Sequence, residues 1–302
     1  MSKIKLLIST FWAMFRQIKS LKTYSRSIVL RSMQKSGTNY LRLILTNYFY
    51  NLDKIKKDNH EYIEVDYDRM HFESFPNIRH MVFDGKSDYT APQVNIYDKE
   101  KYKYSDFMYD HFCILDESPF SAFVKPKKMI MIYRNPLDVL ISRYYFYYKN
   151  RENSDQTYKH PRELINEYIP NYIHIYKWMK QYSSENPNTI LITYEELKLF
   201  PEETITSVLN HLNITVDQEL IRFSLMASSI DKVKETEKKR GFAIHSSSSG
   251  AALKGSFARS GSIGQWKNYF EDTDIDKIKA LLAANNLNLN EFTINPPPDK
   301  AN

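Results

Sequence analysis

Short apolar runs and longer amphipathic stretches alternate along the chain. Segments of strand length with an apolar centre occupy residues 28–30, 129–132 and 189–193, each followed by polar or turn-forming residues. Shorter or less regular runs at residues 81–83 and 110–115 predict two further strands. Residues 129–132 are all apolar, which is the pattern of a parallel strand that is buried on both faces.

Apolar residues recur every three to four positions in the stretches between these strands, the spacing of helices. The predicted helices are 40–48, 137–149, 161–183, 201–211, 217–226 and 273–284. A chain of 302 residues is close to the upper limit for one hydrophobic core. Strands that alternate with helices therefore predict a single α/β domain, with a central, mostly parallel sheet flanked by helices. We expect this domain over residues 25–290 and a flexible tail over 291–302.

An amphipathic helix is predicted for residues 1–24. Its apolar core, residues 6–15, is short and no small-residue cleavage site follows, which disfavours a signal peptide. It is also too short and too charged to span a bilayer. Two interpretations stay open: residues 1–22 pack on their own domain, or they lie in an anionic membrane interface as a peripheral contact.

Composition and charge indicate which kinds of molecule this protein is expected to bind. With 42% hydrophobic and 26% charged residues the chain reads as an ordinary globular protein, and its formal net charge of +6 favours anionic ligands. The basic residues are scattered and no nucleic-acid-binding motif is visible, so we expect no nucleic acid partner. Cys113 is the only cysteine, which favours a cytoplasmic protein without an intrachain disulfide. The eight histidines lack ligand spacing, so we expect no metal.

A polar turn, residues 34–38, joins the first predicted strand to the first long helix. Backbone N–H groups and the positive end of the helix dipole meet at such a helix start, an arrangement that suits phosphate. Lys35 adds a full positive charge, and Gly37 permits a close approach of the backbone to a ligand. The turn therefore predicts a P-loop-like nucleotide-binding core.

A Walker A loop is excluded, because Lys35 precedes Gly37 and no glycine lies upstream at the required spacing. A P-loop kinase or NTPase, the alternative enzyme class, would also require an Asp that holds Mg²⁺ after a central strand. At the end of the strand 129–132 the chain has Arg134 instead, and Ser142 follows on the next helix. Ligands of open α/β sheets bind at such strand ends, although a surface ion pair would also explain Arg134.

These residues resemble a known family. Lys35-Ser36-Gly37-Thr38 resembles the 5'-phosphosulfate loop of sulfotransferases that use 3'-phosphoadenosine 5'-phosphosulfate (PAPS). The segment Tyr133–Ser142 resembles the family's 3'-phosphate element, with the eight-position interval between Arg134 and Ser142 intact. Residues 194–201 are similar to its Tyr-Glu-Asp-Leu-Lys segment, and 228–230 to its Thr/Ser-Ser-Phe. Residues 259–268 resemble Arg-Lys-Gly-x-x-Gly-Asp-Trp-Lys-Asn.

The resemblance implies a donor site for PAPS, with 3'-phosphoadenosine 5'-phosphate (PAP) as product and no metal. The residues implied to bind the nucleotide are Lys35, Ser36, Gly37, Thr38, Asn39, Tyr40, Arg134, Ser142, Tyr194, Ser228, Ile230, Arg259, Ser260 and Gly261. Tyr40 occupies the position of a family tryptophan and would stack on adenine. Ile230 stands where the family has phenylalanine, and Ser260 and Gln265 replace lysine and aspartate. Residues 241–265 would close over the nucleotide as a lid.

The implied catalytic residues are Lys35 and His111. Lys35 would stabilise the leaving phosphate, and His111, 23 positions before Arg134, is the implied general base. The family often has Lys-Thr-His where this chain has Tyr109-Asp110-His111, so one cation is missing. His80 and His71 are alternatives for the base.

The resemblance implies transfer of a sulfuryl group to an acceptor hydroxyl. The acceptor is a small molecule or a glycan, and the basic amphipathic start favours a glycan or glycolipid. The alternative that is not an enzyme is a binding protein with the same fold, which would bind a nucleotide or a sulfated glycan without catalysis. The sequence does not indicate an oligomeric state.

Overall fold

A computed structural model of the chain describes residues 28–55, 61–66, 107–111, 126–149, 158–240 and 259–294. Several predicted features lie outside the described residues. They are the N-terminal helix, the strand 81–83, residues 112–115, lid residues 241–258 and tail residues 295–302.

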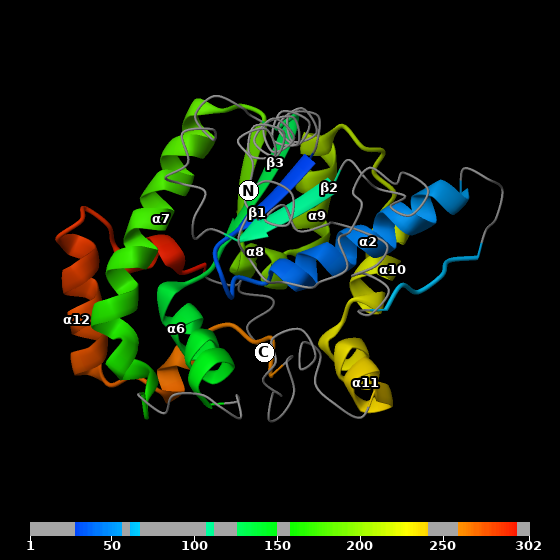
Figure 1. Cartoon of the computed structure of the whole chain (residues 1–302). Coiled ribbons are helices and arrows are strands. Elements are labelled where there is room, and N and C mark those ends of the chain that lie inside the picture. Colours follow the sequence, from blue (N-terminus) through cyan, green and yellow to red (C-terminus); the bar gives the residue numbers. More distant parts are fainter. Residues whose placement is uncertain are drawn as a thin grey trace, which may run out of the picture.

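A four-stranded parallel sheet is the centre of the described structure (Figure 1). Its strands are β1 (Ile28–Ser32), β2 (Phe107–His111), β3 (Lys128–Tyr133) and β4 (Thr189–Thr193), in the order β2-β1-β3-β4. The predicted fold, a single α/β domain with a parallel sheet between helices, is therefore confirmed.

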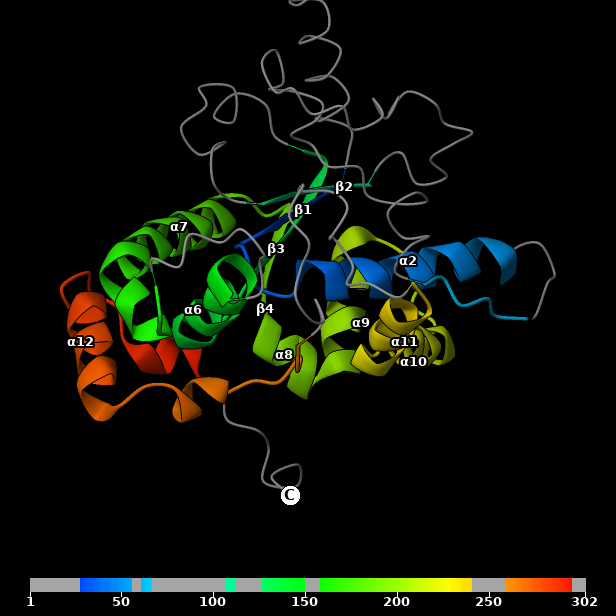
Figure 2. The same ribbon diagram turned by 60° about the horizontal axis from the view of Figure 1, so that its bottom comes forward.

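Helices cover both faces of this sheet. They are α2 (Thr38–Ile55), α6 (Pro136–Tyr144), α7 (Ile165–Glu185), α8 (Tyr194–Leu199), α9 (Pro201–Leu212), α10 (Gln218–Ala227), α11 (Ile230–Arg240) and α12 (Asp272–Ala283). Short helical turns occupy 145–149, 161–164, 265–268 and 289–292. Figures 1 and 2 show α6, α7 and α12 on one side of the sheet, and α2, α9 and α10 on the other.

The core has two halves, one on each face of the sheet. Alternate residues of β3 supply both halves: Met129 and Met131 pack with α6, α7 and α12, whereas Ile130 and Ile132 pack with α2, α9 and α10. Side chains of a strand point alternately to opposite faces, so a strand buried on both faces needs apolar residues at every position. The prediction that β3 is a central, doubly buried strand is confirmed.

Several features differ from the predicted elements; β2 begins three residues before the predicted strand 110–115, and helix α8 was not predicted. The helix expected over 137–149 is α-helical to Tyr144 and continues as a π-helical turn, Tyr145–Lys149. Helix α11 was not predicted, because its sequence is almost entirely polar. The tail was expected from residue 291, yet Phe292 is buried against Tyr176, so residues 291–292 belong to the folded domain.

Candidate active site

The candidate site lies at the carboxyl ends of the strands. In the sheet, β2 lies on one side of β1, and the next strand in the sequence, β3, lies on the other side. The strand order therefore reverses direction at β1. Open α/β sheets bind ligands outside the strand ends at such a switch point. Ser32, at the end of β1, lies in register with His111 on one side and Ile132 on the other. The backbone of His111 therefore lies beside the start of the 33–37 turn.

The turn between β1 and α2 is tightly fixed. The Met33 N–H donates to Ile132 O at 3.0 Å, and the Thr38 hydroxyl donates to Ser32 Oγ at 2.7 Å. Lys35 and Gly37 both have positive φ, of 67° and 86°. The first N–H groups of an α-helix have no intrahelical partner, so the start of α2 presents donors at this turn.

Ser36 and Gly37 fit this turn to an anion. The Ser36 hydroxyl is completely buried and has no hydrogen-bond partner within the described part of the chain. A buried hydroxyl without a partner is costly, and a phosphate oxygen would supply one. At Gly37 a Cβ atom would lie 2.3 Å from Tyr194 Cδ2, so only glycine fits between this turn and α8.

The remaining residues of the predicted phosphosulfate loop differ in their contacts. Lys35 Nζ lies 3.7 Å from the ring centre of Phe146, in the π-helical turn. Asn39 Oδ1 accepts a hydrogen bond from Arg42 at 3.0 Å. Burial raises the pKa of Tyr40 to about 12, with a smaller contribution from nearby Tyr194. Tyr40 is thus a partly buried ring at the start of α2.

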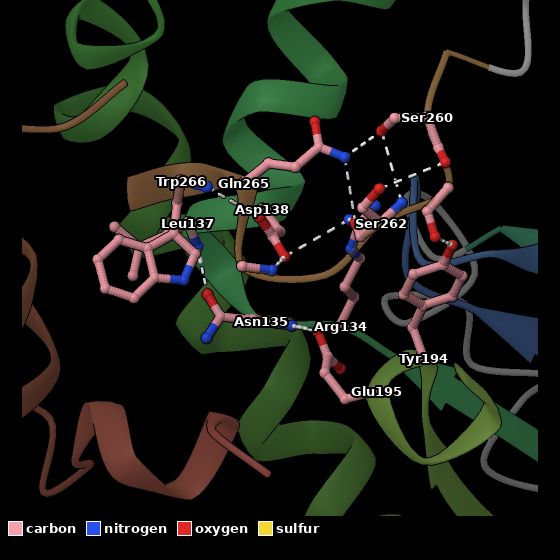
Figure 3. A network of polar contacts seen from close by, with 12 residues as sticks. Arg134, Asn135, Leu137, Asp138, Tyr194, Glu195, Ser260, Ser262, Gln265 and Trp266 are labelled. Atoms are coloured by element: carbon pink, nitrogen blue, oxygen red, sulfur yellow. Dashed lines mark hydrogen bonds and ion pairs between the residues drawn. The ribbon is translucent and has the colours of Figure 1, made fainter. Parts of the chain in front are cut away.

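Arg134 is the buried cation of the site (Figure 3). Its guanidinium lies 4.4 Å from the Tyr194 ring centre and donates to Ser262 O at 2.8 Å. Arg134 Nη2 also lies 3.5 Å from Asp138 Oδ2. Its Nε has no hydrogen-bond partner among the described residues, so this arginine retains a buried donor for a ligand.

Tyr194 joins three of the predicted nucleotide-binding segments. Its ring lies against Gly37 and Arg134, and its hydroxyl donates to Gly261 O at 2.7 Å. Ile230 completes this group, since its Cδ1 atom lies 3.1 Å from the position of a Cβ on Gly261. Residues from the 33–37 turn, the end of β3, α8, α11 and the 259–264 segment therefore meet in one place.

Arg259 is held in an aromatic environment next to this group. Its guanidinium lies 4.4 Å from the Tyr145 ring centre and donates to the Tyr269 hydroxyl at 3.2 Å. It also donates to Gln265, whose amide donates to the Ser260 hydroxyl. The two residues that depart from the family's lysine and aspartate thus form a neutral pair with each other.

Two of the residues predicted to bind the nucleotide, Ser228 and Ser142, have different surroundings. Ser228 is completely buried at the end of α10, with its hydroxyl 3.5 Å from Asn47 Nδ2. Ser142 is partly exposed on α6. For His111 the structure gives the backbone position alone.

Asp138 and Glu195 were not singled out from the sequence. Asp138 accepts hydrogen bonds from the Gly264 and Trp266 N–H groups at 2.7 and 3.2 Å. Glu195 accepts from the Asn135 N–H at 3.1 Å, and burial raises the pKa of its carboxyl to about 7. The sequence did contain a signal that could have identified these two residues, since each lies inside a segment that resembles a family motif.

In the part of the chain that the structure describes, no helix has the length and apolar character needed to cross a membrane. The same residues include no group of three or more His, Cys, Asp or Glu side chains that could hold a metal ion.

Comparison with known proteins identifies the family of this chain. A family model described as "Sulfotransferase domain" matches residues 25–288. Human sulfotransferase 2A1 is 30% identical over 168 residues, which cover 53% of this chain and 58% of that protein. Sulfotransferase 6B1 of Danio rerio is 23% identical over 171 residues, covering 55% and 54%. These alignments span little more than half of the relatives' length.

Solved structures share the fold. Retinol dehydratase in a complex with retinol and PAP aligns with a TM-score of 0.61 at 15% identity, covering 93% of this chain and 88% of that one. Mouse sulfotransferase SULT7A1 complexed with PAP aligns with a TM-score of 0.56 at 15% identity, covering 89% and 87%. The match of the family model to most of the chain, on the fold and site described above, shows that this protein belongs to the sulfotransferase domain family.

Proposed function

We propose that this protein transfers a sulfuryl group from PAPS to an acceptor hydroxyl. The observation that carries the proposal is the convergence of two elements suited to anions at the neighbouring carboxyl ends of β1 and β3: the 33–37 turn and the group around Arg134. Tyr194 contacts both Gly37 and Arg134, so the two elements are close enough to hold one nucleotide by its two phosphate ends. That the structural neighbours named above were solved with PAP supports the same donor.

The residues present fit this nucleotide. The 33–37 turn supplies the buried Ser36 hydroxyl, which has no partner among the described residues, and a lysine for the 5'-phosphosulfate. Arg134 supplies an Nε that is likewise unpaired within the described ranges, and Arg259 supplies a second guanidinium for the 3'-phosphate. A guanidinium suits a dianionic phosphate because its donors are arranged as a planar fork.

Each catalytic residue has a defined task in this proposal. The sulfur–oxygen bond to the acceptor forms as the sulfur–oxygen bond to the 5'-phosphate breaks, and PAP leaves. Lys35 and the N–H groups at the start of α2 stabilise the phosphate oxygen as it becomes anionic. His111 receives the proton of the acceptor hydroxyl. As in phosphoryl transfer, positioning and electrostatics supply most of the rate enhancement.

For the acceptor we propose a small apolar alcohol, with a glycan hydroxyl as the second candidate. Phe146 lies directly against Lys35, so the sulfuryl end of the donor would face an aromatic ring. Related proteins were solved with androsterone or retinol bound, which favours the small molecule.

Calorimetry with PAP and turnover of labelled PAPS test this proposal. Lys35→Ala and Arg134→Ala should each weaken PAP binding at least tenfold, because each loses a charged phosphate contact. His111→Ala should keep PAP affinity and lose turnover. Arg222→Ala is the matched control, since this exposed arginine pairs with Glu202 on the surface.

Each rival function predicts a different result. Binding of ATP with Mg²⁺ in preference to PAP would indicate a kinase or NTPase. PAP binding without turnover on any acceptor class, small alcohols and glycans included, would indicate a non-catalytic binding protein. Unchanged PAP affinity in both Lys35→Ala and Arg134→Ala would overturn the site.

A further inference from the structure

We propose that Asp138 is a positioning residue for the 3'-phosphate end of the site, a role that rests on the proposed function. It would fix the 259–266 segment to helix α6 and hold Arg134 toward this segment. Neither task requires Asp138 to touch the nucleotide.

Both carboxylate oxygens of Asp138 bind this segment (Figure 3). Oδ2 accepts the Gly264 N–H at 2.7 Å and Oδ1 accepts the Trp266 N–H at 3.2 Å. Gly264 has a φ of 72°, and a turn with one left-handed residue directs neighbouring N–H groups into a concave anion site. The carboxylate of Asp138 fills that site from α6.

Arg134, which directly follows β3, binds the same segment. Its Nη2 donates to Ser262 O at 2.8 Å and lies 3.5 Å from Asp138 Oδ2. Asp138 and Arg134 therefore hold residues 262–266 between them and also contact each other. Since Ser262 O also accepts from Gln265, a partner of Arg259, both predicted 3'-phosphate arginines belong to one hydrogen-bonded network.

The charge of Asp138 allows a direct test of its role, because repulsion of the phosphate and positioning of the arginines have opposite effects on nucleotide affinity. This carboxylate is 2% exposed and lies next to the arginine that would bind a dianionic phosphate. By charge alone it repels the phosphate, so its removal would tighten binding. If Asp138 positions the two arginines, its removal weakens binding instead. The two effects thus have opposite directions in one measurement.

Asp138→Asn tests this with two nucleotides, PAP and adenosine 5'-monophosphate, which lacks the 3'-phosphate. The two N–H groups bind different oxygens of Asp138, and in asparagine one of these becomes an NH2 group that cannot accept, so the segment loses one anchor. We expect PAP affinity to fall at least about tenfold, while adenosine 5'-monophosphate affinity stays within about twofold. Unchanged or tighter PAP binding, or an equal loss for both nucleotides, would overturn the proposal.

Two further variants separate positioning from general stability. Gly264→Ala strains the turn without changing any charge, and its Cβ would meet nothing within 4 Å. It should show the same selective loss of PAP affinity. Asp217→Asn is the matched control, because Asp217 also accepts a main-chain N–H at a helix start, that of Leu220 at 3.0 Å, away from the arginines. It should leave the ratio of the two affinities unchanged.

A measurement without nucleotide separates this proposal from the proposed function. Trypsin cleavage after Arg259 and Lys267, located by mass spectrometry, reports how firmly the segment is held. Cleavage should be at least about tenfold faster in Asp138→Asn than in the unchanged protein or Asp217→Asn, because opening of the segment sets the rate. Equal rates would reject Asp138 as the anchor even where PAP binds. Faster cleavage in a protein that does not bind PAP would reject the donor and keep the anchor.

Discussion

Gly37 is the residue at which the candidate site tolerates least change. Its φ of 86° disfavours any side chain, and a Cβ would collide with the Tyr194 ring. Gly37→Ala should therefore move Tyr194 away from Arg134 and lower PAP affinity more than tenfold, at a stability cost of about 1–3 kcal/mol.

Gly264→Ala is the matched comparison, because it carries the backbone strain without the collision. Urea unfolding should show a larger loss of stability for Gly37→Ala than for Gly264→Ala. Equal losses would mean that Tyr194 moves aside at little cost.

Glu195 gives the protein a pH-dependent stability. Burial raises the pKa of its carboxyl from 4.5 to about 7, although Asn135 N–H and Arg134 act in the opposite direction. The folded protein thus holds this proton more tightly than the unfolded chain. The stabilising contribution of the neutral carboxyl is complete below about pH 4.5 and is lost as the pH rises through about 7.

Glu195→Gln should remove this dependence, because an amide imitates the neutral acid and still accepts the Asn135 N–H. Between about pH 5 and 7, the free energy of unfolding of the unchanged protein should fall relative to the variant by about 1 kcal/mol per pH unit. Urea unfolding at several pH values measures the difference. Parallel pH profiles for the two proteins would contradict it.

At the scale of elements, helix α2 acts as a partner for an extended segment. Asn47 accepts the Val65 N–H at 2.8 Å and donates to Val65 O at 3.0 Å, and Asn51 binds Ile63 in the same way. Four helical residues and two extended residues both advance about 6 Å, so the two pairs match in spacing. The backbone groups of Ile63 and Val65 thus find their partners in side chains of α2.

Asn47→Ala should leave the buried N–H and C=O groups of Val65 without partners. The expected loss is about 2–3 kcal/mol of unfolding free energy, together with faster hydrogen exchange at the Val65 amide. Asn285→Ala is a suitable control, because Asn285 donates to Leu281 O at the end of its own helix and accepts from the exposed Lys177. A loss below that of the control would contradict the pairing.

The elements were predictable where apolar periodicity was strong. Strands β1, β3 and β4 and helices α2, α9, α10 and α12 lie where the pattern placed them. Helix α11 gave no such signal, because Val233 is the one strongly apolar side chain after Ile230. The π-helical turn 145–149 was also not predictable, since its aromatic residues fit an α-helical pattern equally well.

The site was predictable by residue type, and less so by contact. Lys35 and Arg134 were chosen as cations for phosphate at strand ends, and motif resemblance added Arg259 and Tyr194. Pairwise contacts across 128 positions, such as Arg134 to Ser262, leave no trace in local sequence. Asp138 shows the limit best, because both of its hydrogen bonds come from main-chain N–H groups, which every residue except proline has.

At the scale of the molecule, PAP should stabilise the whole fold, because residues from five separate elements surround the proposed nucleotide site. A ligand that binds only the folded state adds about 2.7 kcal/mol at 100 times its dissociation constant. Thermal unfolding should therefore shift upward with PAP concentration. Arg134→Ala should shift much less at the same concentrations, and no shift in the unchanged protein would contradict PAP binding.

The strand order has a consequence for biosynthesis. Ile28 pairs with Phe107 and Lys128, which follow it 79 and 100 positions later, and β3 in turn awaits Thr189–Thr193. A ribosome adding 5–20 residues per second needs roughly 5 to 20 seconds to supply both partners of β1. During that time the apolar strand β1 has no sheet to join. The nascent chain is then most exposed to aggregation, and chaperone supply should govern its yield more than the stability of the finished fold.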